Sequence, residues 1–192
     1  MNKKRWISII IIVGLLAIDQ ASKWIIYFSQ SFPMHQRVPI ILIGDKPIIS
    51  FYKVINYGAG LSILEGQTWF FIMMAFIAVI ALSILIYRFG NFKTHKVFTI
   101  GLAFLYAGAL GNGIDRFTNG GGVIDFLEFT FLKDLPGIGF LFNWSCNFAD
   151  GCLTAGVILV IIEFLFLDRI RKKKKHMEFE KQALLEKSQD QK

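Results

Sequence analysis

Acidic and amide side chains recur at intervals along an otherwise apolar chain. Asp19, Asn112 and Asp150 lie inside or at the ends of long apolar segments, and Asp125 lies in a connection between two of them. Charged groups inside membrane-spanning segments are costly and usually mark a functional site. Two carboxylates that are held close in a low-dielectric pocket cannot both ionise easily, so one keeps its proton. Such a pair suits amide hydrolysis, because the ionised acid activates a water and the protonated acid polarises the carbonyl.

Other hydrolytic chemistries have weaker support. His35, His95 and His176 lie in separate segments, so no metal site is predicted. Cys146 and Cys152 have no metal-ligand spacing and indicate no disulfide framework. No serine or cysteine has a plausible histidine base at the expected level of the acids. We therefore expect a site without a metal or another cofactor.

The elements that must position these acids are membrane helices. The 192 residues are 54% hydrophobic and only 18% charged, with a mean hydropathy of +0.52. Apolar windows long enough to cross a bilayer are found at residues 6–28, 68–87, 97–114 and 147–167. The first window could pass for a signal peptide, but no small-residue cleavage site follows it, so we expect a retained anchor.

The distribution of basic residues predicts the topology. Lysine and arginine gather at the N-terminus, between Arg88 and Lys96, and in the tail from Arg169. The positive-inside rule then places both termini in the cytoplasm and residues 29–67 and 116–146 outside it. The basic run Arg171–Lys175 favours contact with anionic lipid headgroups over nucleic-acid binding. We expect residues 1–170 to form one membrane domain and residues 171–192 a basic cytoplasmic tail.

The two outer connections contain strand patterns. β-Branched runs at residues 38–43 and 47–55 are interrupted by Gly44-Asp45, and a third run at residues 123–129 follows Gly120-Gly121-Gly122. The predicted fold is an all-α polytopic membrane protein of four transmembrane helices, with a small extracytoplasmic β-cradle and a lid-like loop.

The polar residues fall at one depth. With a rise of about 1.5 Å per residue, Asp19 lies about 20 Å, Asn112 about 22 Å and Asp150 about 26 Å from the cytoplasmic side. Each also has a simpler explanation: Asp19 could pair with Lys23 and Asn112 with Arg116, both four residues apart, and Asp150 could cap its helix. The nearby Asp115 adjoins Arg116 and could form an ion pair with it. Their convergence on one level favours a polar site near the outer face.

Five segments in order resemble the lipoprotein signal peptidases (signal peptidase II). They are Asp19-Gln20-Ala21-Ser22-Lys23, Asn56-Tyr57-Gly58-Ala59-Gly60, Gly108-Ala109-Leu110-Gly111-Asn112-Gly113-Ile114-Asp115-Arg116, Val123-Ile124-Asp125-Phe126 and Asn147-Phe148-Ala149-Asp150. The resemblance spans nearly the whole chain apart from the tail.

The resemblance implies roles for these residues. Asp125 and Asp150 match the two catalytic acids of a metal-free aspartyl dyad. Asp19, Lys23, Asn112 and Asn147 match residues that support the dyad and its substrate, Asn56 and Arg116 match positions that hold the substrate backbone, and Asp115 matches a structural acid.

The resemblance also implies a substrate and a location. The substrate is a prolipoprotein that carries S-diacylglyceryl cysteine, and the enzyme removes its signal peptide by cleaving just before that cysteine. The location is the bacterial cytoplasmic (inner) membrane, where the partners are substrates and membrane lipids, not nucleic acid, and we expect a monomer.

Some features depart from the family pattern. Cys146 stands where a bulky apolar residue is usual, Gly151 replaces a hydroxyl residue, Gly60-Leu61 replaces Ala-Phe, and residues 133–145 are longer than usual. None removes an acid, so these departures bear on the lid and on substrate preference.

Two alternatives carry acids in membrane spans. A proton-coupled transporter would need a path of acids through the bilayer, but Glu163 is the one acid in the inner halves of the spans. A presenilin-like peptidase would need a Gly-x-Gly-Asp motif, and Gly111-Asn112-Gly113-Ile114-Asp115 has one residue too many.

Overall fold

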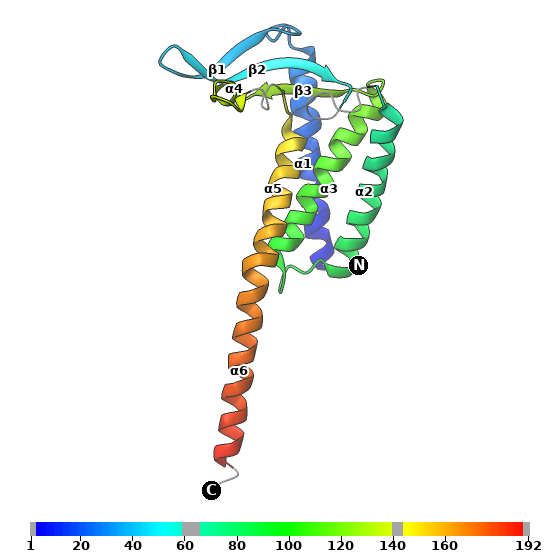
Figure 1. The fold of residues 1–192 in the computed structure, drawn as a ribbon. Coiled ribbons are helices and arrows are strands. Elements are labelled where there is room, and N and C mark those ends of the chain that lie inside the picture. Colours follow the sequence, from blue (N-terminus) through cyan, green and yellow to red (C-terminus); the bar gives the residue numbers. More distant parts are fainter. Residues whose placement is uncertain (1–2, 59–65, 140–143, 190–192) are drawn as a thin grey trace.

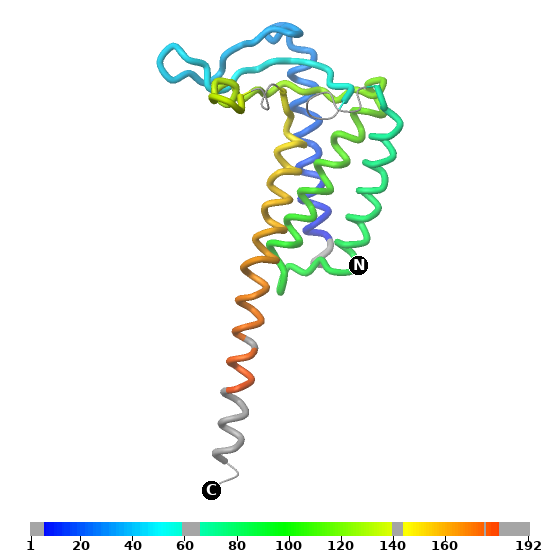
Figure 2. Tube along the Cα trace, viewed as in Figure 1, coloured from blue at the N-terminus to red at the C-terminus, as the bar shows by residue number. Residues whose placement is uncertain are grey.

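The computed structural model describes residues 3–58, 66–139 and 144–189 (Figures 1 and 2). Its helices are α1 (Lys3–Phe28), α2 (Thr68–Phe89), α3 (Lys96–Thr118), the short α4 (Thr130–Lys133), α5 (Phe148–Ile162), the π-helix η3 (Glu163–Leu167) and α6 (Asp168–Gln189). Four helical stretches are long and apolar enough to cross a membrane: Trp6–Phe28, Thr68–Phe89, Lys96–Thr118 and Phe148–Glu180. The four predicted membrane helices are confirmed.

A three-stranded antiparallel sheet covers one end of the bundle, here called the sheet end (Figure 1). Its order is β1 (Arg37–Ile43), β2 (Lys46–Asn56), β3 (Val123–Glu128). The register places Tyr52 opposite Arg37 and Val54 opposite Asp125. The predicted small sheet is therefore present. The description "all-α" applies to the membrane part alone, because the strands β2 and β3 also carry site residues.

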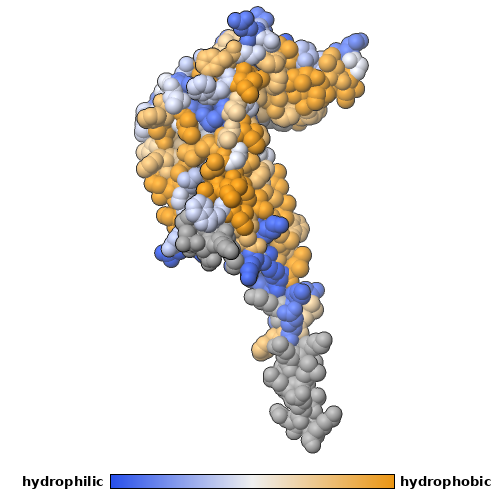
Figure 3. Space-filling model, turned by 180° about the vertical axis from the view of Figure 1, so that it is seen from behind, coloured by the Kyte–Doolittle hydropathy of each residue, from blue (hydrophilic) through white to orange (hydrophobic). Residues whose placement is uncertain are grey.

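The exterior of the helices is apolar and much of their interior is polar. α2 buries none of its residues, and large side chains such as Trp69, Phe76 and Ile84 face outward. Apolar side chains likewise dominate the visible flank of the bundle in Figure 3. In contrast, Asp19 and Lys23 are fully buried. This inversion is what a lipid environment requires of a helical bundle.

α3 occupies the centre and meets α5 through glycines. A Cβ on Gly108 would lie 2.6 Å from the carbonyl oxygen of Ala149, and one on Gly101 would lie 3.1 Å from that of Gly156. Small residues allow membrane helices to approach closely. The close approach brings the polar upper part of α3 against the start of α5.

Several boundaries differ from the sequence prediction. α3 ends at Thr118 instead of residue 114, because Asp115 and Arg116 remain in its last turns. The fourth span does not stop at residue 167: α5, η3 and α6 form one continuous helical stretch to Gln189. The division into a domain at 1–170 and a tail at 171–192 remains a prediction.

Candidate active site

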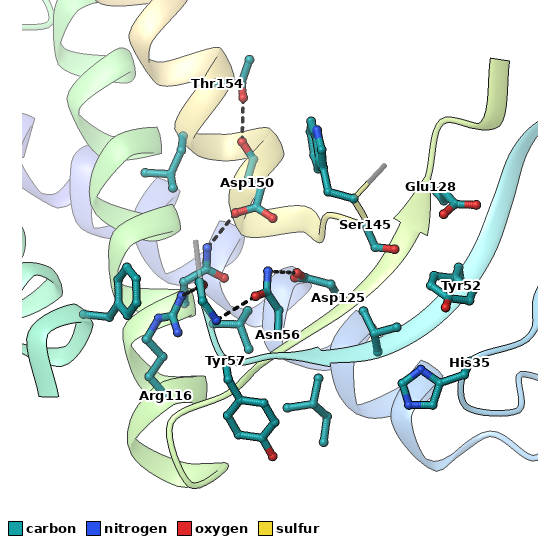
Figure 4. A pocket seen from close by; sticks show the side chains of 18 of the residues that line it. His35, Tyr52, Asn56, Tyr57, Arg116, Asp125, Glu128, Ser145, Asp150 and Thr154 are labelled. Carbon is teal, nitrogen blue, oxygen red and sulfur yellow. Dashed lines mark hydrogen bonds between the residues drawn. The ribbon is translucent and has the colours of Figure 1, made fainter. Parts of the chain in front are cut away.

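A cavity of about 820 Å³ lies beneath the sheet at the sheet end of the bundle (Figure 4). It is lined from all three strands of the sheet and from the ends of α2, α3 and α5. Its lining includes Asn56, Phe71, Asn112, Arg116, Asp125, Leu153 and Thr154. Asp150 also lines it, so both predicted catalytic acids face one space.

Asp125 enters the cavity from the middle of β3. Its side chain is buried and accepts two amide hydrogen bonds, from Asn56 Nδ2 at 2.9 Å and from Asn147 Nδ2 at 2.7 Å. Burial and the neighbouring charge of Asp150 raise the pKa of Asp125 to about 7, even though both amides oppose the shift. Asp125 therefore keeps a proton near neutral pH much more readily than an exposed aspartate.

Asp150 is held at the start of α5 by a capping box. The side chain of Asn147 accepts from the Asp150 N–H at 3.1 Å, and the Asn147 N–H donates to Asp150 Oδ2 at 3.0 Å. The N-cap is thus Asn147, not Asp150. Asn112 Nδ2 adds a hydrogen bond to Asp150 Oδ1 at 2.8 Å. The two hydrogen bonds to its oxygens fix the orientation of the Asp150 carboxyl group at the N-terminus of α5.

A buried charged network supports Asn112 from behind. Lys23 Nζ lies 2.9 Å from Asp19 Oδ2 and 3.1 Å from Asp115 Oδ2, and it donates to Asn112 Oδ1 at 3.0 Å. Because an ammonium can only donate, it fixes the oxygen of the Asn112 amide toward Lys23 and turns the NH₂ group toward Asp150.

The two anionic partners of Lys23 also organise backbone. Asp19 Oδ1 accepts from the Ala149 N–H at 2.9 Å in the first turn of α5. Asp115 Oδ2 accepts from the Ile124 N–H at 3.0 Å, next to Asp125. One network therefore fixes the backbone beside each acid. The pairing of Asp19 with Lys23 is confirmed, whereas Asp115 pairs with Lys23 and not with Arg116.

Arg116 and Asn56 border the other side of the cavity. Arg116 Nη2 donates to the Gly58 carbonyl at 2.9 Å and Nη1 to the Gly121 carbonyl at 3.1 Å, with the guanidinium over the Phe71 ring. Asn56 Oδ1 accepts from the Gly58 N–H at 3.0 Å. Both side chains thus shape the turn after β2. The predicted residues Ala59, Gly60 and Leu61 lie outside the described residues.

Cys146 is buried beside the acids but is a poor nucleophile. Its thiol donates to the Leu127 carbonyl at 3.4 Å. Burial and the charges of Asp150 and Asp125 raise the pKa of Cys146 to about 12, so it stays protonated. Within the ranges 3–58, 66–139 and 144–189, no three His, Cys, Asp or Glu side chains gather as a metal site.

The structure brings all eight predicted site residues together. Five of them line the cavity: Asn56, Asn112, Arg116, Asp125 and Asp150. Of the other three, Lys23 hydrogen-bonds Asn112, Asn147 hydrogen-bonds Asp125, and Asp19 pairs with Lys23. Sequence reasoning missed Gln20, whose Nε2 donates to Asp19 and to Asp115. It also missed a charged far end of the cavity, lined by His35, Arg37, Tyr52 and Glu128.

A family model described as signal peptidase (SPase) II matches residues 11–166. The chain belongs to this family. It resembles the lipoprotein signal peptidase of Lactiplantibacillus plantarum, with 35% identity over 167 residues that cover 87% of this chain and 99% of that protein. The lipoprotein signal peptidase of Listeria monocytogenes is 33% identical over 160 residues, which cover 83% of this chain and 92% of the relative.

Solved structures show the same fold. A bacterial membrane enzyme determined by the in meso method at 2.3 Å resolution is 32% identical and superposes with a TM-score of 0.67, covering 82% of this chain and 87% of that one. A second such structure, at 1.9 Å resolution, is 31% identical with a TM-score of 0.67, covering 83% and 92%.

Membership of the signal peptidase II family makes this chain a peptidase and a multi-pass bacterial membrane protein. Family membership disfavours the transporter alternative. The position of Glu163 also disfavours it, because this acid is far from the cavity and is paired. Glu163 lies fifteen residues after the start of α5, about 22 Å along the helix. There it pairs with Arg171 and with His95 Nδ1 at 2.9 Å.

Proposed function

We propose that this member of the signal peptidase II family is an aspartyl endopeptidase that removes the signal peptides of diacylglyceryl-modified prolipoproteins. It cleaves the amide bond just before the lipidated cysteine. One observation carries the proposal: Asp125 and Asp150 line one cavity, and Asn147 hydrogen-bonds both of them. Two acids coupled in this way share a proton, as a water-activating dyad requires.

The environments of the two acids support different roles in this proposal. Asp150 has a backbone N–H, the Asn112 amide and a helix N-terminus to stabilise its negative charge. Asp125 is more deeply buried, and its pKa is raised to about 7. Asp150 is therefore the general base and Asp125 the general acid in the first step.

The reaction follows from this assignment. Asp150 takes a proton from a water, and the resulting hydroxide attacks the carbonyl carbon of the scissile amide. Asp125 gives its proton to the carbonyl oxygen, which yields a neutral gem-diol. Asp150 then gives its proton to the amide nitrogen while Asp125 takes one from a gem-diol hydroxyl, so that the C–N bond breaks and both acids return to their starting states. The products are the signal peptide carboxylate and a lipidated cysteine with a free amino group.

Asn56 and Arg116 are the substrate-holding residues in this proposal. Both line the cavity, and both can offer N–H donors to a peptide carbonyl once the substrate displaces part of their present contacts. Phe71, Leu153 and Thr154 open the cavity toward the membrane helices. A signal helix in the bilayer thus reaches the acids from the side of α2 and α5.

The cavity lies at the outer face of the membrane in this proposal, and both termini are cytoplasmic. A lid-like loop within residues 116–146 remains part of the proposal, and Trp144 and Ser145 of this range line the cavity. The enzyme acts as a monomer and uses no metal.

A direct assay tests this function. Purified protein in detergent micelles is given a diacylglyceryl-modified prolipoprotein and the same chain without lipid, with the Asp150→Asn variant as a matched control. We expect the signal peptide to be released from the lipidated chain, orders of magnitude more slowly from the unmodified chain, and not by the variant. Positioning of the cysteine by its lipid is the reason, since both substrates are membrane-immersed. Full activity in EDTA is also expected. Equal rates on both substrates, or an active Asp150→Asn variant, would refute the proposal.

A further inference from the structure

The end of the cavity farthest from α2 is charged and has no role in the chemistry described above. It is lined by His35, Arg37, Tyr52 and Glu128, which we call the basic arm. In Figure 4, Asp125 and Asp150 lie between Arg116 on one side and His35, Tyr52 and Glu128 on the other. The arm is built on all three strands of the sheet.

Glu128 is neutralised, and a positive charge remains. Its carboxylate is 1% exposed and pairs with Lys133 and with Arg37 Nε at 2.5 Å. Although burial alone would raise it, the hydrogen bonds from Arg37 and Lys133 hold the pKa of Glu128 below its ordinary value. Counted together with Lys133, which lies outside the cavity lining, the three charged side chains carry a formal charge of +1.

Arg37 is the cation that faces the open space. Its side chain is 50% exposed, whereas that of Lys133 is 17% exposed. Two contacts fix the guanidinium of Arg37. Its Nε and Nη2 donate to the Glu128 carboxylate, and its Cζ lies 4.7 Å from the centre of the Tyr52 ring. Within the described part of the chain, Nη1 makes no hydrogen bond. A preorganised guanidinium with a free N–H edge favours a carboxylate.

The backbone beside Arg37 is also held in an unusual conformation. His35 has φ of 59°, in the left-handed region that favours glycine. Its N–H donates to the Lys53 carbonyl at 3.0 Å, and its ring lies 6.4 Å from that of Tyr52. Residues in such conformations cluster at ligand-binding sites. His35 thus adds a polar ring to the lining of the arm.

The direction of the bound substrate and the distance from Asp125 to Glu128 indicate which part of the substrate lies near the basic arm. If the proposed function holds, the signal helix enters from α2 and α5, so the chain after the scissile bond leaves toward the sheet. Glu128 follows Asp125 by three residues on β3, which corresponds to about 10 Å. An extended substrate covers that distance in about three residues. The side chain near Arg37 is thus one of the second to fourth residues of the mature lipoprotein, counting the cysteine as the first.

We propose that the basic arm is a specificity subsite for the mature side of the substrate, in which Arg37 binds an acidic side chain at one of these positions. The inference rests on the proposed function and adds a substrate preference to it. Arg37 touches substrate without taking part in bond cleavage.

The test uses lipidated substrates that differ at one residue. Asp, Asn or Lys is placed at position two, three, four or ten of the mature chain, and kcat/KM is measured for each. We expect Asp over Lys by about fivefold at one of positions two to four, the size that a half-exposed ion pair gives. At position ten, beyond the reach of the arm, we expect a ratio near one. The preference should weaken as ionic strength rises.

Enzyme variants then assign the preference to Arg37. Arg37→Gln should bring the Asp-to-Lys ratio to about one, and Arg37→Glu should invert it. Lys46→Gln, which removes an exposed cation of the same sheet outside the cavity lining, should leave the ratio unchanged. His35→Gly keeps the positive φ of this position, so it tests what the His35 side chain contributes to the preference without straining the backbone. Each ratio is internal to one preparation, so partial misfolding of a variant does not affect it.

The outcomes separate the two proposals. Cleavage of the Asn substrates with equal rates for Asp and Lys at every position would overturn the subsite and leave the peptidase function standing. A preference that persists in Arg37→Gln would also overturn it. Failure to cleave any lipidated substrate would overturn the proposed function, and the subsite with it.

Discussion

Asn147 and Asp150 hold each other by reciprocal hydrogen bonds in the first turn of α5. Each accepts from the backbone N–H of the other, at 3.1 and 3.0 Å. The same Asn147 amide reaches across to Asp125 at 2.7 Å. A local helix-capping motif thereby fixes the separation of two acids that are 25 residues apart in the sequence. The catalytic predictions below depend on this relationship.

The dyad prediction concerns the two acids themselves. Asp125→Asn and Asp150→Asn should each lower kcat by about 10³-fold or more, since general acid–base groups contribute about 10²–10⁴-fold apiece. The double variant should be little worse than either single one, because the acids act as a unit. Single-turnover cleavage of a lipidated prolipoprotein measures all three.

A matched control is Asp45→Asn, which changes an exposed aspartate in the β1–β2 turn. It should keep full activity. Substantial turnover by either dyad variant would instead move the chemistry to another acid, with Asp115 the first to examine.

The activity should have a bell-shaped pH dependence. Because the pKa of Asp125 is raised to about 7, the protonated general acid is lost as pH rises through that value, and kcat/KM should fall above it. Protonation of Asp150 should lower the rate on the acidic side. The pH profile of kcat/KM with a lipidated substrate checks this, and a rate that is flat from pH 6 to pH 9 would contradict it.

The same shift predicts a pH dependence of stability. The pKa of Asp125 is raised from 3.8 to about 7 on folding, so the folded state holds this proton more strongly than the unfolded state. Ionisation therefore destabilises the protein progressively between those values, and the effect is complete above pH 7. Asp125→Asn removes this dependence, so its Tm relative to wild type should rise from pH 4 to pH 7 and then level off. Thermal unfolding in detergent measures the slope, and a parallel pH dependence would contradict the prediction.

Lys23 should be important for folding more than for chemistry. Lys23→Met leaves Asp19 and Asp115 buried without their cation, and breaking a buried ion pair in this way costs about 3–5 kcal/mol. Adding Asp19→Asn should restore part of the stability, because the two residues are directly coupled. Lys93→Met, an exposed residue of the α2–α3 connection, is the control. Equal stability of Lys23→Met and wild type would contradict the role assigned to the network.

Much of this site could be predicted because membrane helices convert sequence position into depth. The rise per residue alone places Asp19, Asn112 and Asp150 at one level. The β-branched runs on both sides of Gly44-Asp45 predict the first two strands, because such runs around a short turn are typical of a β-hairpin. The pairing of Asp19 with Lys23 follows from their spacing on one helix.

Other features depend on contacts that no spacing reveals. Lys23 reaches Asp115 across 92 positions, and Arg37 reaches Glu128 across 91. Such pairs exist only once the strands and helices are placed relative to one another. Asparagine and aspartate are both good N-caps, so the sequence allows Asp150 as well as Asn147, and only the reciprocal hydrogen bonds identify which residue starts the helix.

The topology prediction follows from the lysine and arginine distribution. Reporter fusions after residue 92 and at the C-terminus should report cytoplasm, and a fusion near Asp45 should report the outside. A cytoplasmic signal from the Asp45 fusion would place the sheet and its cavity on the wrong side for an exported substrate.

The final prediction compares a glycine in the α3–α5 contact, Gly108, with a glycine of α5 outside it, Gly151. A Cβ on Gly108 would lie 2.6 Å from the Ala149 carbonyl oxygen and 2.7 Å from Leu153 Cγ, whereas a Cβ on Gly151 would meet nothing within 4 Å. Gly108→Ala should therefore push the helices apart and cost about 1–3 kcal/mol. Because Ala149 precedes Asp150, this shift should also lower activity.

Gly151→Ala is the matched control, with the same chemical change one residue after Asp150. It should stabilise the protein by about 0.5–1 kcal/mol, since alanine is preferred to glycine inside a helix, and leave turnover unchanged. Thermal unfolding in detergent and turnover of a lipidated substrate measure both effects. If Gly108→Ala were as stable and active as Gly151→Ala, α3 and α5 would not be in contact at Gly108, and the position of Asp150 beside Asn112 would have another cause.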